Sequence, residues 1–258
     1  MKIVILGAGN LAWHLAPFLR KKGHEIIAVY SRTKLSAESL AKKVKAIPTN
    51  KIEDIPVDAD LYIVALQDKS ISTVLKSLHF IPNCIAHTSG SVSISVFPKK
   101  FKNTGVLYPL QTFSKNRKVN LSDVPFLIES SNLRTKKVLS SLAKSISPNV
   151  HFISSDKRKK IHLAAVFANN FVNHLYSISA DILKESKLSF DLLKPLIMET
   201  ASKVQGNAPE KMQTGPARRN DIEVIKSHLN LLKGQKNKKA VYSLLSASII
   251  DKFKVRTK

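Results

Sequence analysis

The first fifteen residues, MKIVILGAGNLAWHL, hold the feature that most limits what this chain can fold into. Four apolar residues lead into Gly7 and Gly9, and a G-x-G-x-x-A pattern joins this predicted strand to a helix. In a βαβ unit, Gly7 permits the tight turn and Gly9 lets the backbone approach a pyrophosphate at the helix N-terminus. The third position needs only a small side chain, which Ala12 provides. We expect Asn10 and Leu11 to belong to the same cofactor site; the alternative is a tight turn that binds nothing.

The end of the second predicted strand indicates which dinucleotide binds. Proteins that bind NAD place an acidic residue there, which bonds the ribose 2′-hydroxyl. This chain has VYSRT instead, so that Ser31 and Thr33 offer hydroxyls and Arg32 offers a planar cation. Because this set suits a 2′-phosphate, we predict NADP(H) rather than NAD(H). The alternative is that Arg32 is a solvated loop residue.

The first 153 residues alternate between short apolar stretches and helical stretches, which predicts an α/β fold with a Rossmann-type, mostly parallel sheet covered on both faces. After Ser154 the pattern changes to long helical stretches at about 156–185, 189–205, 219–233 and 237–254. We therefore predict an NADP-binding domain in residues 1–153 and an all-α domain in residues 154–258.

Two segments follow predicted strands at the edge of the sheet where ligands of open α/β folds bind. Leu66 and Gln67 come after the fourth strand and are expected beside the cofactor. His87 ends the fifth strand, where it would be either catalytic, facing the nicotinamide, or structural. We predict no metal site, because the histidines lack carboxylates at ligand spacing and one cysteine cannot form a thiolate site.

The net charge of +24 makes a nucleic-acid partner a hypothesis to be weighed. The basic residues are spread evenly along the chain and most are lysine, whereas reading of bases favours arginine. We therefore expect no specific nucleic-acid partner. No stretch approaches the roughly 20 apolar residues of a membrane span, and the N-terminus lacks a secretory apolar region, so we expect a cytoplasmic protein.

Several segments together resemble a known group of proteins. GAGNLAWHLA, VYSRT, AHTSGSVS and YPLQTFS resemble the N-terminal half of pyrroline-5-carboxylate reductase. They are more similar to a bacterial family of Rossmann-like proteins whose C-terminal helical domain is a domain of unknown function. Two motifs of that domain are matched, H-x-A-A-V-F-x-x-N-F by His162 to Phe171 and T-G-P-x-x-R-x-D by Thr214 to Asp221.

This resemblance covers nearly the whole chain and implies a helical domain of the 6-phosphogluconate dehydrogenase type. It further implies a homodimer formed through the helical domain. The reaction it implies is hydride transfer between NADP(H) and a small carbonyl, hydroxy-acid or imine substrate, with a deazaflavin-linked reaction as a variant.

The helix KKIHLAAVFANNFVNHLYSISADIL carries the candidate active site. Helical spacing groups His162 with Asn169, whereas the resemblance points to His162 and Asn170. We expect His162 and Asn170 to be catalytic and Asn169 to bind the substrate. His162 is the first candidate for the proton donor, because imidazole titrates near neutral pH, and His174 is the second. A structural histidine at 162 is the alternative.

The related hydroxy-acid dehydrogenases carry a lysine four residues before this asparagine, and this chain has Val166 there. The missing lysine motivates a second hypothesis, a non-catalytic NADP-binding sensor or scaffold. Our principal hypothesis is an NADP(H)-dependent oxidoreductase.

The loop QTGPARRND supplies a candidate anion site. Arg219 could clamp a carboxylate or phosphate of a small substrate. Asp221 could instead hold Arg219 and stabilise the start of the next helix. Asn220 stands where the family pattern leads us to expect glycine. Tyr108 and Gln111, from YPLQTFS, are expected in the wall of the substrate pocket.

Overall fold

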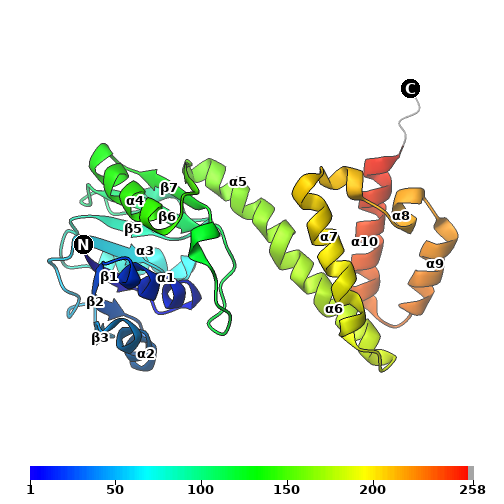
Figure 1. Ribbon diagram of the computed structural model, residues 1–258, viewed down its shortest axis with the longest axis horizontal. Helices are drawn as coiled ribbons and strands as arrows, with labels where there is room; N and C mark the ends of the chain where they lie inside the picture. Colours follow the sequence, from blue (N-terminus) through cyan, green and yellow to red (C-terminus); the bar gives the residue numbers. More distant parts are fainter. Residues whose placement is uncertain (255–258) are drawn as a thin grey trace. The chain divides into compact units, whose positions relative to one another are not determined.

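A computed structural model describes residues 1–254, and an eight-stranded sheet forms the centre of its first half (Figure 1). The strand order is β3-β2-β1-β4-β5-β6-β7-β8. All neighbours are parallel except β6 and β7, which are antiparallel. The strands are β1 (Lys2–Leu6), β2 (Glu25–Tyr30), β3 (Ile47–Thr49), β4 (Leu61–Val64), β5 (Ile85–His87), β6 (Thr104–Pro109), β7 (Phe126–Ser130) and β8 (Val150–Phe152). The predicted mostly parallel Rossmann-type sheet is confirmed.

Alternate side chains of the strands enter two separate cores, one on each face of the sheet. Ile3 and Ile5 of β1 pack with helices α1 (Asn10–Lys21), α2 (Lys34–Val44) and α4 (Leu133–Ile146). Val4 and Leu6 pack on the other face with α3 (Asp68–Ser77) and with Phe97 and Phe101. Because the sheet is covered on both faces, central strands such as β1 and β4 are almost entirely apolar and buried, as in other parallel sheets.

The second half of the described chain is helical. The sequence predicted one helix over about 156–185, and the structure has α5 (Ser155–Ala165), a π-helix (Val166–Phe171) and α6 (Val172–Glu185) in its place. The remaining helices are α7 (Lys194–Gly206), α8 (Pro216–Arg219), α9 (Ile222–Leu231) and α10 (Lys236–Phe253). Short 3₁₀ turns occupy Ile94–Val96, Leu121–Asp123, Phe190–Leu193 and Pro209–Met212.

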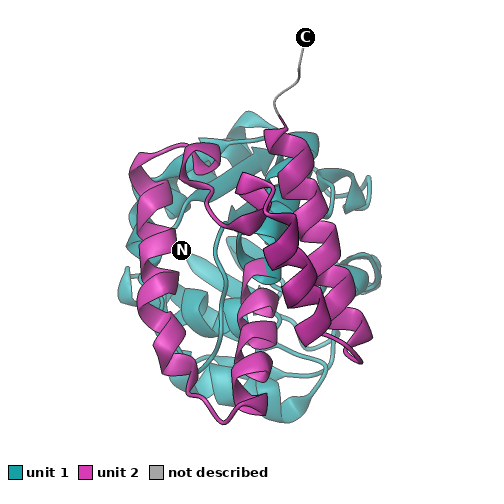
Figure 2. Cartoon of the chain, turned by 90° about the vertical axis from the view of Figure 1, so that its right-hand side faces the viewer, with its two compact units in different colours: residues 1–171 teal, residues 172–258 magenta. Residues whose placement is uncertain are grey.

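Two compact units divide the chain, Met1–Phe171 and Val172–Lys258 (Figure 2). The division falls within the helical run, whereas the sequence places the change of domain at 153–154, where the strands end. Helix α5 belongs to the first unit because Ser155 and Arg158 bond to Glu129 of β7. No helix among the described residues is long and apolar enough to cross a membrane.

Candidate active site

The turn after β1 has the form that a dinucleotide phosphate needs. Gly7 has φ +124°, and a Cβ atom there would lie 2.1 Å from the Ala65 carbonyl oxygen and 3.2 Å from Leu66 Cδ2. Gly9 is the N-cap of α1, and a Cβ atom on it would meet nothing within 4 Å. The first N–H groups of α1 therefore face open space, where they can bind an anion. This cradle fits the pyrophosphate of NADP.

The end of β2 places polar groups at the start of the next helix. The Ser31 N–H donates to the Thr49 carbonyl at 3.0 Å, and Thr33 is the N-cap of α2, which has no acidic residue in its first turn. Arg32 is exposed, and no ion pair holds it among the described residues. A cation beside a helix N-terminus fits the 2′-phosphate that distinguishes NADP.

One pocket brings together seven of the residues expected in the site. Its volume of ≈ 730 Å³ is in the range of ligand pockets, and it lies within the first unit. Its wall contains Asn10 and Leu11 of α1, Tyr108 and Gln111 from the end of β6 onward, and His162, Asn169 and Asn170. The pocket therefore adjoins the cofactor turn at the carboxyl ends of the strands. No lysine, arginine or carboxylate is among its lining residues.

Tyr108 and His162 form a hydrogen-bonded pair in this pocket. The hydroxyl lies 3.2 Å from His162 Nδ1, and the two rings meet edge to face. Gly90 packs against both side chains, since a Cβ atom on it would lie 2.6 Å from His162 Nδ1 and 2.8 Å from Tyr108 Cζ. Burial raises the pKa of Tyr108, the Asp68 carboxylate adds to the rise and Arg158 opposes it. The phenol is therefore protonated at neutral pH.

The π-helix that follows α5 carries both asparagines of the pocket. Asn169 and Asn170 lie within Val166–Phe171, and both line the pocket. Helical spacing groups Asn169 rather than Asn170 with His162, because it assumes an unbroken α-helix. Isolated π turns are rare and occur often at functional sites.

His87 does not line the pocket. Its side chain is fully buried, its ring stacks on Phe97 with centroids 5.6 Å apart, and its Nδ1 accepts the Ser89 N–H at 3.2 Å. Burial lowers the pKa of His87 to about 4, and the Arg158 charge contributes to the shift, so the ring is neutral at pH 7. These contacts favour the structural role that was the alternative for His87.

Leu66 and Gln67 lie where the sequence placed them, after β4. Leu66 is beside the Gly7 turn, and Gln67 is the N-cap of α3. Both therefore sit at the edge of the sheet that carries the cofactor turn.

The TGP loop lies in the second unit, at a separate hollow of ≈ 800 Å³. Arg219 lines this hollow with Arg218, whose guanidinium lies 4.3 Å from the centre of the Phe253 ring. Asp221 caps α9, accepting the Val224 N–H at 3.2 Å, so its contact is the helix-stabilising one. Asn220 has φ 56°, a left-handed conformation that asparagine tolerates, which explains how it can replace glycine here.

A buried polar cluster next to the pocket was not predicted. Arg158 is fully buried and pairs with Glu129, although it stands in the run DKRKK, which is typical of a solvated helix face. Ser155 joins both of them. The only sequence signal was an arginine among lysines. Among the described residues no group of three or more His, Cys, Asp or Glu side chains could hold a metal ion.

Two family models match the chain. The model described as NADP oxidoreductase coenzyme F420-dependent matches residues 2–97, and the model described as Domain of unknown function (DUF2520) matches residues 124–249. No curated protein matches the chain.

Solved structures match over nearly the full length. A putative NADP oxidoreductase from Bacteroides fragilis is 42% identical, with a TM-score of 0.92, and the match covers 97% of this chain and 98% of that one. A reductive aminase from Aspergillus terreus, solved with NADPH and ethyl-5-oxohexanoate, is 13% identical with a TM-score of 0.73, covering 96% and 92%. A 1-pyrroline-5-carboxylate reductase from Streptococcus pyogenes is 17% identical with a TM-score of 0.63, covering 98% of each chain. The last two are similar in fold.

Proposed function

The chain belongs to the NADP oxidoreductase family of its Bacteroides fragilis relative, and on this premise we propose that it reduces a C=O or C=N bond of a small molecule, or catalyses the reverse oxidation. The observation that carries the proposal is the pocket in which Asn10 and Leu11, next to the phosphate cradle, face the Tyr108–His162 pair. A cofactor site and a proton-transfer pair in one pocket are the two requirements of such a reaction.

Two separate groups of residues bind the two phosphate-bearing parts of the cofactor. The turn at Gly7 and Gly9 and the N–H groups of α1, from Asn10 onward, hold the pyrophosphate, and Ser31, Arg32 and Thr33 hold the 2′-phosphate. When bound, NADP(H) supplies the hydride chemistry. The protein supplies orientation and the proton.

Replacing Arg32 with alanine is expected to raise the dissociation constant of NADPH by about 10- to 100-fold, the worth of a charge-assisted hydrogen bond of about 1.5–3 kcal/mol. The dissociation constant of NADH should stay the same, because NADH has no 2′-phosphate. Isothermal titration calorimetry measures both. Arg134→Ala, an exposed arginine on α4, is the matched control. Unchanged NADPH binding in Arg32→Ala would rule out the 2′-phosphate role.

The proton passes through His162. In its protonated form both ring nitrogens of His162 carry a proton; Nδ1–H then donates to the Tyr108 hydroxyl, which fixes the orientation of the ring and leaves the Nε2 proton for transfer. His162 would donate that proton to the oxygen or nitrogen of the substrate and become neutral. Val166 in place of the usual lysine is consistent with a different donor in this chain.

The substrate is oriented by neutral polar groups of the pocket. Gln111, Asn169 and Asn170 each offer a carboxamide, which can donate and accept hydrogen bonds, and we assign Asn170 to the reacting group. Arg219 lines the separate hollow of the second unit, and we propose it as the partner of an anionic group that binds there.

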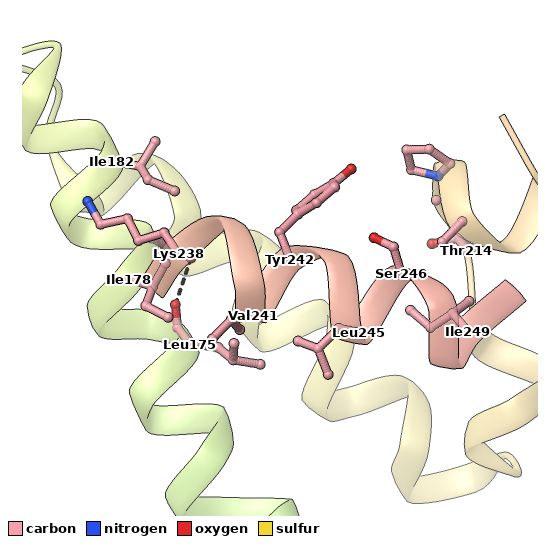
Figure 3. Close-up of a pocket in the computed structure, with 14 residues that line it drawn as sticks. Leu175, Ile178, Ile182, Thr214, Lys238, Val241, Tyr242, Leu245, Ser246 and Ile249 are labelled. Carbon is pink, nitrogen blue, oxygen red and sulfur yellow. Dashed lines mark hydrogen bonds between the residues drawn. The ribbon is translucent and has the colours of Figure 1, made fainter. Parts of the chain in front are cut away.

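A homodimer through the helical unit completes the proposal. Among the described residues of Val172–Lys258, the buried large apolar side chains are Ile225 and Leu232, whereas Leu196, Met198 and Leu244 are more than 60% exposed. An apolar groove is lined by Ile178 and Ile182 of α6 and by Val241 and Leu245 of α10 (Figure 3). Apolar surface of this extent is typical of an interface between subunits.

We expect sedimentation equilibrium to give twice the chain mass of 28.6 kDa. Leu196→Glu should shift the protein toward monomer, because it would bury a carboxylate in the interface. Leu35→Glu, at an exposed leucine of α2, should leave the mass unchanged. A monomer in the unmodified protein would contradict the proposed dimer.

The experiment that tests the proposed function measures oxidation of NADPH by the purified protein. The candidate acceptors are 2-keto acids, neutral ketones, cyclic imines and coenzyme F420, and we expect turnover with at least one class. Binding of NADPH without turnover across all four classes would favour the sensor hypothesis.

A further inference from the structure

Arg158 is the largest fully buried side chain of the described residues, and its position in the fold is unusual for a cation. Lys157, Lys159 and Lys160 around it are exposed. The Arg158 guanidinium reaches three elements: Nη1 lies 2.5 Å from Glu129 Oε2 of β7, and Nη2 donates to the Val92 carbonyl at 2.6 Å and to Ser155 Oγ at 3.2 Å. Burial of a cation is costly unless it is paired and hydrogen-bonded.

Ser155 ties the same elements together a second time. Its hydroxyl donates to Glu129 Oε2 at 2.7 Å and accepts the Ile94 N–H at 3.0 Å. Burial alone would raise the pKa of Glu129, but hydrogen bonds from Ser155 and Arg158 and the Arg158 charge outweigh burial and lower it. The carboxylate is therefore ionised at neutral pH and balances the guanidinium. The first turn of α5 is fixed to β7 and to the segment after β5.

This cluster lies one helical turn from the proton donor. Arg158 and His162 are four residues apart on α5, so they lie on the same face of the helix. Val92, which accepts from Arg158, is two residues beyond Gly90, which packs against His162. The helix and the segment after β5 therefore meet at two neighbouring points, and one of them is the Gly90–His162 contact.

We propose that the cluster of Arg158, Glu129 and Ser155 positions His162 against Tyr108, so that Arg158 and Glu129 are positioning residues for the proton transfer. The inference rests on the proposed function for its reaction step. Its physical basis is that the 3.2 Å contact between Tyr108 and His162 depends on the rotation of α5 about its axis and on its position along that axis. The bonds of the buried Arg158 guanidinium fix both. A misplacement of about 1 Å can cost about 10²-fold in rate.

The test compares Glu129→Gln, which keeps the shape and removes the charge, with Arg158→Lys, which keeps the charge and removes the planar fork. The imidazole nitrogens of ¹⁵N-labelled His162 are followed by NMR without cofactor, so that the readout does not depend on turnover. We expect both variants to shift the His162 nitrogen signals toward those of Tyr108→Phe. Turnover should fall about 10- to 100-fold, with the dissociation constant of NADPH unchanged.

Tyr62→Phe is the matched control, because it removes a partly buried hydrogen bond, from the Tyr62 hydroxyl to the Pro56 carbonyl at 2.7 Å, without touching the pocket. It should lower the thermal midpoint and leave the His162 signals in place. If either Arg158 or Glu129 variant fails to fold, Ser155→Ala provides the milder case and should give a smaller shift in the same direction.

The inference would be overturned if the His162 signals stayed in place in every variant that folds while stability fell as in Tyr62→Phe. The cluster would then be a structural ion pair with no role in positioning His162. A separate outcome concerns the proposed function alone: if His162→Gln leaves turnover intact, the proton role fails, whereas the NMR result on positioning stands.

Discussion

Gly7→Ala is expected to prevent stable folding of the first unit, whereas Gly9→Ala is expected to fold and to lose NADPH. At Gly7 the backbone has φ +124°, which costs an alanine about 1–3 kcal/mol. The added methyl group would also lie 2.1 Å from the Ala65 carbonyl oxygen, and this neighbour is backbone that cannot rotate away. The turn between β1 and α1 would have to move, and β1 pairs with both β2 and β4 in the centre of the sheet.

At Gly9 the methyl group meets no protein atom within 4 Å, so folding is little affected. The loss of a glycine N-cap costs at most about 1 kcal/mol. The methyl group instead occupies the space assigned to the pyrophosphate, and we expect the dissociation constant of NADPH to rise at least tenfold, about 1.4 kcal/mol. Thermal unfolding followed by circular dichroism and calorimetric titration of NADPH separate the two effects.

Gly206→Ala is the control for both variants, because a Cβ atom there also meets nothing within 4 Å and the residue ends α7 in the other unit. It should retain both stability and NADPH affinity. If Gly9→Ala bound NADPH as tightly as the unmodified protein, the pyrophosphate could not be assigned to this turn.

The strands of the sheet could be predicted from the sequence because the signals for them come from neighbouring residues. Apolar runs such as KIVIL, the glycine turn and the end of α4 at Ile146 each follow from neighbouring residues. The antiparallel direction of β7 does not, because nothing in VPFLIES distinguishes the two directions; the direction depends on how the chain crosses from β6. The π-helix was missed for a related reason, since Val166–Phe171 has the composition of an ordinary helix.

The candidate site was predictable as far as residue types reveal chemistry. His162, Tyr108 and Gln111 were identified from motifs, and they line one pocket. Arg158 was not identified, because its burial is decided by Glu129, a residue on a distant strand. His87 was expected from its place at a strand end, but whether a side chain there faces the crevice or the core depends on the register of the strand.

His162→Gln is expected to lower kcat by about 10²–10⁴-fold, the usual contribution of a general acid. Glutamine keeps polar atoms near Tyr108, so NADPH affinity should remain unchanged. It cannot transfer a proton, so the loss should be in kcat. Tyr108→Phe keeps the acid but frees its ring, so we expect a smaller loss of about five- to tenfold, the worth of one neutral hydrogen bond.

Two further histidine variants decide between His162 and its competitors. His151→Gln, at an exposed histidine of β8, should leave the rate unchanged. His174→Gln tests the second candidate, which lies on α6 and does not line the pocket. If His174→Gln rather than His162→Gln lowered kcat, the proton donor would come from α6, and the Tyr108–His162 pair would be left with a role in shaping the pocket.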